Sequence, residues 1–98
     1  MSWVNAVEVY YRVERDHGRG DADEVFSELR TLIELELPGT PRMVETARIK
    51  AARRLALGDC FAIATATAHG LPLLTGDPEI LSEAGLPCET VDLRPRRR

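Results

Sequence analysis

The segment from residue 57 to residue 77 constrains the fold more than any other part of the chain. It reads LGDCFAIATATAHGLPLLTGD, and its first part carries small apolar side chains at Ala62, Ala64, Ala66 and Ala68. A helix this slim can pack against a sheet and a neighbouring helix at once, so we expect it to lie at the centre of the molecule. Gly70 is a typical helix-ending residue, and the apolar run 71–75 predicts a strand.

The rest of the chain predicts further helices separated by short strands. Apolar residues recur at helical spacing over about 4–14, 21–32 and 41–55, and the residues after Asp77 predict a short helix with proline at its first position. Strict alternation predicts a strand at 33–37, and a last strand is expected at 88–93. This order favours an α/β domain with a parallel sheet.

Composition limits the kind of protein. The 98 residues allow one domain, expected at 1–93, followed by a basic tail at 94–98. With 44% hydrophobic and 30% charged residues the chain should fold, and its net charge of −3 argues against a general polyanion binder. The two cysteines have neither metal-type spacing nor a disulfide framework. No segment has the length of a membrane span or begins like a signal peptide, so we expect a cytoplasmic protein without membrane contact.

Three carboxylates are the candidate functional residues. Asp77 follows a predicted strand, where open α/β sheets place their ligands, and Asp59 begins the central helix just before that strand. Glu8 lies on the flank of the first helix. Each has a structural alternative: Asp59 and Asp77 as helix N-caps, and Glu8 as part of a capping box over Asn5-Ala6-Val7-Glu8. Three carboxylates within ~4 Å would repel by about 4 kcal/mol per pair at an effective dielectric of 20, a cost that a divalent cation removes. Oxygen ligands suit Mg²⁺ or Mn²⁺.

These residues occur in segments that resemble a known family. GDCFAIATATAHGLPLLTGDPEI, residues 58–80, resembles the C-terminal half of a PIN-domain ribonuclease of the VapC toxin type, in which an Asp opens an alanine-rich helix and a strand leads into Thr-x-Asp. SWVNAVEVYY, residues 2–11, is similar to the family's helix with an invariant Glu, which maps to Glu8. The helix at 43–57 resembles the one that precedes the aspartate in the family.

The resemblance implies a fold and a chemistry. The fold would be a three-layer α/β/α domain with a short parallel sheet, and the activity Mg²⁺-dependent (or Mn²⁺-dependent) hydrolysis of RNA. Glu8, Asp59 and Asp77 would be the catalytic metal ligands, and the hydroxyl of Thr75 would orient a ligand or water. RNA and an antitoxin protein would be the partners. Arginines and a lysine at 42–54, together with the tail, are the expected phosphate contacts.

The chain also departs from the family pattern. PIN domains open with a central strand ending in Asp, followed by helices and a second strand, and residue 1 here corresponds to the end of that second strand. We therefore expect a sheet without the N-terminal central strands and a site short of one carboxylate. A misassigned start codon, a fragment, or a second copy that supplies the missing surface would each explain this.

An incomplete sheet has two further consequences. It should expose sheet edges and the apolar helix positions Val4, Val7 and Tyr11, so we expect a homo-oligomer. Two alternatives to the enzyme stay open. The chain could be a non-catalytic PIN remnant that binds a protein such as an antitoxin, or a plain α/β scaffold in which all three acids are caps and no metal binds.

Overall fold

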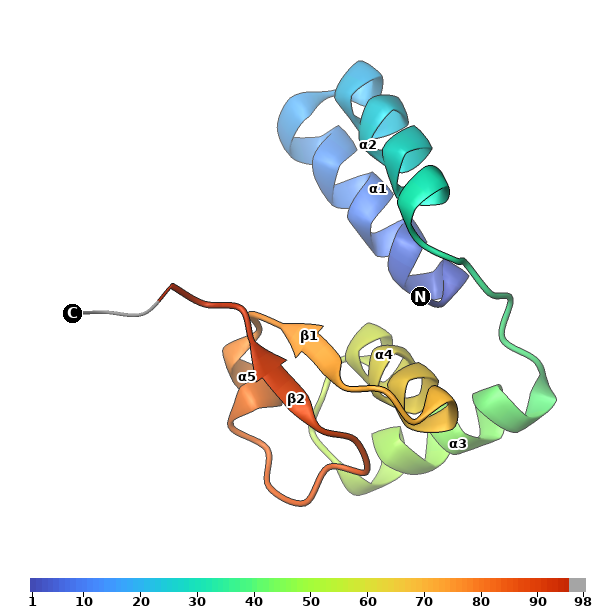
Figure 1. The fold of residues 1–98 in the computed structure, drawn as a ribbon, viewed down its shortest axis with the longest axis vertical. Helices are drawn as coiled ribbons and strands as arrows, with labels where there is room; N and C mark the ends of the chain where they lie inside the picture. The colour runs from blue at the N-terminus through green and yellow to red at the C-terminus, as the bar shows by residue number, and fades with distance from the viewer. Residues whose placement is uncertain (96–98) are drawn as a thin grey trace.

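The structure, a computed structural model, describes residues 1–95, and the remaining residues of the predicted basic tail (96–98) lie outside the described part. Figure 1 shows a helical hairpin at one end and a small α/β unit at the other. In chain order the elements are α1 (Trp3–His17), α2 (Arg19–Leu32), α3 (Thr40–Ala52), α4 (Leu57–His69), β1 (Leu73–Thr75), α5 (Pro78–Leu81) and β2 (Thr90–Asp92).

The hairpin of α1 and α2 is held by aromatic packing. Phe26 on α2 lies 5.8 Å from the ring of Trp3 and 5.7 Å from the ring of Tyr10, measured between ring centroids. Gly18 joins the two helices with a positive φ of 92°, a conformation that glycine adopts at little cost. The second helix consequently begins at Arg19, two residues before the predicted start at residue 21.

The core surrounds α4, as the small side chains of this helix predict. Cys60, Ile63 and Ala64 have no exposed surface, and Leu55 and Ile80 pack with them. The helix contacts α1, α3 and β1. Gly70 ends it in the left-handed conformation, with its amide bonded to carbonyls of the last turn. The prediction of a central, buried helix is confirmed.

The sheet consists of β1 and β2, paired in parallel with Leu73 opposite Thr90 and Thr75 opposite Asp92. The predicted α/β class with a short parallel sheet is confirmed. Leu73 donates its amide to the carbonyl of Glu89, and the carbonyl of Thr75 accepts from Leu93. In a parallel ladder, alternate residues direct their backbone groups to the same side. Leu74 therefore directs its N–H and C=O away from β2, to an edge that no described strand covers.

The predicted strand at 33–37 is wrong. This segment forms a single parallel bridge, between Glu36 and Ser2, and no described strand. Pairing stops there because α1 begins at Trp3, directly after the bridged residue. Two apolar residues of the alternating pattern consequently stay exposed, Ile33 at 39% and Leu37 at 80%, while Leu35 is half-buried. Side chains hold the segment instead: Glu36 pairs with Arg42 and with His69.

Within residues 1–95, no helix combines the length and the apolar character needed to cross a membrane.

Candidate metal and catalytic site

Asp59 lies in the first turn of α4 but does not cap it. Ala56 is the N-cap residue, so the capping alternative does not account for this aspartate. Its side chain is half-buried. Burial first, and then the nearby carboxylates of Asp77, Glu8 and Glu79, raise the pKa of Asp59 above that of an ordinary aspartate. The carboxyl group of Asp59 therefore lies in a region of excess negative charge.

Asp77 lies two residues after the last residue of β1 and caps α5. One of its carboxylate oxygens, Oδ1, accepts a hydrogen bond of 2.8 Å from the amide of Glu79. The Thr75 hydroxyl accepts a hydrogen bond of 3.0 Å from the amide of Asp77, which fixes the turn between strand and helix. Capping occupies one oxygen, so the capping and ligand interpretations of Asp77 are compatible. Thr75 contributes here by orienting the aspartate.

Glu8 reaches α4 from α1. Its carboxylate lies so close to Gly58 that a Cβ at that position would overlap it. Asn5, one turn earlier on α1, donates one hydrogen bond of 3.2 Å to Glu8 and another of 2.9 Å to the carbonyl of Gly58. The capping alternative for Glu8 is wrong, because Ser2 caps α1 through a 3.2 Å bond from the amide of Val4.

Asn5 and Gly58 are two parts of the site that the sequence alone did not indicate. The spacing of Asn5 and Glu8 was visible, but it indicated a helix cap and not a polar group facing another helix. The need for glycine at 58 depends on a contact between residues far apart in the chain, so it has no local signal.

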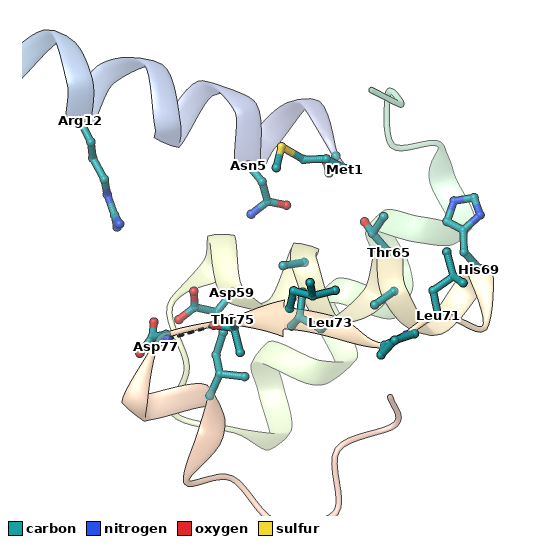
Figure 2. A pocket seen from close by; sticks show the side chains of 16 residues that line it. Met1, Asn5, Arg12, Asp59, Thr65, His69, Leu71, Leu73, Thr75 and Asp77 are labelled. Atoms are coloured by element: carbon teal, nitrogen blue, oxygen red, sulfur yellow. Dashed lines mark hydrogen bonds between the residues drawn. The ribbon is translucent and has the colours of Figure 1, made fainter. Parts of the chain in front are cut away.

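Asp59 and Asp77 open onto one pocket of about 430 Å³ between α1 and the α4–β1 unit. Figure 2 shows the two carboxylates side by side with Thr75, while Asn5 and Arg12 extend toward them from α1. The floor of the pocket is apolar, formed by small α4 side chains, Leu73 and Ile80. Glu8 does not line this pocket itself, but its charge acts on Asp59.

The donor chemistry of these residues fits a hard divalent cation, since all three candidates offer carboxylate oxygens. Their arrangement is more open than a finished metal site. Among residues 1–95, no three Asp, Glu, His or Cys side chains lie close enough together to hold a metal ion. The structure thus brings Asp59 and Asp77 into one pocket, with Glu8 beside it at the start of α4.

Most of the phosphate contacts expected at residues 42–54 have structural partners. Arg53 bonds to Glu83 and to the carbonyls of Ala84 and Gly85. Lys50 donates to the carbonyl of Leu55. Together with the Arg42–Glu36 pair, these contacts assign three of the five basic residues at 42–54 to holding the fold.

The fold and the acidic pocket define the class of protein, which comparison with known families identifies. The model of the PIN domain family matches residues 1–85, so the chain belongs to the PIN domain family. The fold described above is therefore a PIN domain fold.

The chain is also similar to two curated proteins named ribonuclease VapC1, from the CDC 1551 / Oshkosh and the ATCC 25618 / H37Rv strains of Mycobacterium tuberculosis. Each is 39% identical to it over 59 residues, which are 59% of this chain and 43% of the relative. The match thus spans less than half the length of these relatives. No solved structure matches the chain.

Proposed function

We propose that the chain is a metal-dependent endoribonuclease of the VapC type, which hydrolyses phosphodiester bonds of RNA in the pocket beside Asp59 and Asp77. One observation carries the proposal: Asp59, which caps nothing, opens onto the same pocket as Asp77 and has its pKa raised by burial and by the surrounding carboxylates. Acidic side chains whose pKa is raised by burial and by neighbouring carboxylates are typical of functional sites. The similarity to relatives named ribonuclease VapC1 supports the same activity.

Glu8, Asp59 and Asp77 are the residues that would hold Mg²⁺ or Mn²⁺. When bound, such an ion supplies an activated water and stabilises charge on the leaving oxygen. The protein's own contribution is positioning. Asn5 orients Glu8 against α4, and Thr75 orients Asp77 through its amide. We expect slow cleavage, because no third described acid closes the site to coordination distance.

RNA cleavage with matched variants tests this proposal. Asp77→Asn is the sharpest variant, because asparagine caps a helix as well as aspartate does while removing the charge. We expect cleavage by the unaltered chain to need Mg²⁺ or Mn²⁺, to stop with EDTA and to be lost in Asp77→Asn. Cleavage that persists in EDTA and in Asp77→Asn would overturn the proposed chemistry.

A second candidate function is a non-catalytic PIN domain that binds a protein such as an antitoxin. The open arrangement of the three acids supports it. The two proposals differ in one measurement: a binding module should show no metal-dependent cleavage of RNA, at any enzyme concentration, while its fold and its protein binding survive Asp77→Asn. The cytoplasmic location and the antitoxin partner stay predictions in both cases.

A further inference from the structure

Arg12 is an exposed, positively charged residue that lines the acidic pocket. It leaves α1 one turn after Glu8 and extends toward Asp59 and Asp77 (Figure 2). Among the described residues that line this pocket, it is the one arginine or lysine. Its side chain is 62% exposed, and its Nη2 atom lies 3.9 Å from Oε2 of Glu8, the outer limit of an ion pair. An exposed pair at this distance contributes little to stability.

Other arginines of the fold have closer partners. Arg94, which follows β2, binds Asp92 through two nitrogens, with distances of 2.7 to 3.2 Å. Arg53 is held by one carboxylate and two carbonyls near the end of α5, as described above. The guanidinium groups of Arg53 and Arg94 are therefore already hydrogen-bonded within the fold. Arg12 has a loose ion pair with Glu8 and a side-chain contact with the exposed Tyr11, and its own side chain is exposed where it lines the pocket. Its guanidinium is therefore available to a ligand.

The charges around Arg12 favour an anion once the acids are neutralised. The guanidinium of Arg12 is a permanent cation that lines the same pocket as Asp59 and Asp77. A divalent cation held by Glu8 and Asp59 would cancel most of the negative charge that attracts Arg12. The planar guanidinium would then be free to bind a phosphate group through two parallel hydrogen bonds.

We propose that Arg12 is a phosphate-binding residue of this pocket, which holds a backbone phosphate of an RNA strand next to Asp59 and Asp77. The proposal rests on the proposed function, because it names a substrate contact in the same site. It assigns to α1 the phosphate contact that the basic cluster at 42–54 was expected to make.

Binding of a short fluorescein-labelled single-stranded RNA, followed by fluorescence anisotropy in Mg²⁺ over a series of salt concentrations, tests the role of Arg12. Arg12→Ala should weaken binding about tenfold and reduce the slope of log affinity against log salt by about 0.7. Arg12→Lys should retain the slope and lose part of the affinity, since lysine keeps the charge without the planar fork.

Arg15→Ala is the matched control. Arg15 lies on the same helix with a side chain 65% exposed, but it pairs with Asp16 at 3.0 Å and does not line the pocket. It should change neither affinity nor slope. Equal binding by the unaltered chain and Arg12→Ala, or no binding of the RNA by the unaltered chain, would overturn the proposal.

The two proposals fail in different ways. Arg12-dependent binding without any cleavage would leave Arg12 as a phosphate contact and refute the nuclease activity. Metal-dependent cleavage with RNA affinity unchanged in Arg12→Ala would refute the phosphate contact and keep the nuclease. A purely structural role for Arg12 would appear as a lower melting temperature with an unchanged salt slope, and that result also counts against the contact.

Discussion

The carboxylate of Glu8 lies against the α-carbon of Gly58, in space that any side chain at position 58 would need. This contact joins α1 to the first turn of α4 and brings the third acid toward Asp59. It is also a contact with a flexible side chain, so a larger residue at 58 can displace Glu8 without breaking the backbone.

We therefore predict that Gly58→Ala separates stability from metal binding. Alanine in a helix should stabilise the fold by about 0.5–1 kcal/mol, less any loss from the displaced Glu8, while Mn²⁺ binding weakens because Glu8 turns away. Gly20→Ala is the control, since Gly20 lies in α2 with nothing within 4 Å of the added carbon. Thermal unfolding and Mn²⁺ titration of both variants check this. Unchanged Mn²⁺ affinity in Gly58→Ala would show that Glu8 is not a ligand.

Asp59 should cost stability when it is ionised. Its folded pKa is raised above the unfolded value, so its contribution favours the folded state in acid and is lost as pH rises through the folded pKa. Asp59→Asn should consequently stabilise the chain by about 0.5 kcal/mol at neutral pH, a figure reduced for the solvent that still reaches this group.

The pH dependence is the sharper part of that prediction. The gain should shrink as pH falls through the folded pKa of Asp59, because the unaltered aspartate is then also neutral. Urea unfolding of both chains at several pH values measures it, with Glu45→Gln on exposed α3 surface as the control. A gain that stays constant with pH would mean that the charge of Asp59 is not its cause.

Much of the fold and part of the site could be predicted from the sequence, for identifiable reasons. Some features are encoded by short sequence patterns, namely the small residues of α4, the end of that helix at Gly70 and the acids at 59 and 77. They depend on neighbouring residues in the chain and not on distant contacts. The strand at 33–37 failed because pairing needs a partner strand, and Ser2 offers one bridge before α1 begins. Asn5, Gly58 and Arg12 gain their roles from the approach of α1 to α4, which no single segment encodes.

The edge of β1 that faces away from β2, which no strand within residues 1–95 covers, should accept another strand. Leu74 directs its backbone groups away from β2, and the acidic pocket lies between β1 and the bridge formed by Ser2. An apolar strand ending in Asp, joined ahead of Met1 by a flexible linker, should pair there and bring a further carboxylate to the pocket beside Asp59 and Asp77. We predict a steep rise in the rate of RNA cleavage. The same added strand ending in Asn is the control, and equal rates for both would contradict the prediction.

Exposed apolar residues on α1 should support self-association. Val7 and Tyr11 lie one turn apart and are 59% and 45% exposed, whereas Val4, which was expected to be exposed with them, is half-buried. Exposed apolar surface is typical of interfaces. We predict a homodimer or larger assembly that Val7→Lys shifts toward monomer, whereas Ser27→Lys on exposed α2 surface does not. Light scattering at low micromolar concentration measures the mass. A stable monomer of the unaltered chain would count against the assembly.

Titration of Mn²⁺ into the unaltered chain and into Asp59→Asn tests the central claim most directly, namely that the acids around this pocket form a cation site. Isothermal calorimetry should show weak, saturable binding to the unaltered chain. Because the metal must displace protons, the affinity should decrease on acidification, beginning at a higher pH than for an ordinary aspartate. Asp59→Asn should bind at least about tenfold more weakly, because even residues that only orient a metal ligand typically contribute that much to affinity. Equal Mn²⁺ affinity of the two proteins would contradict the account.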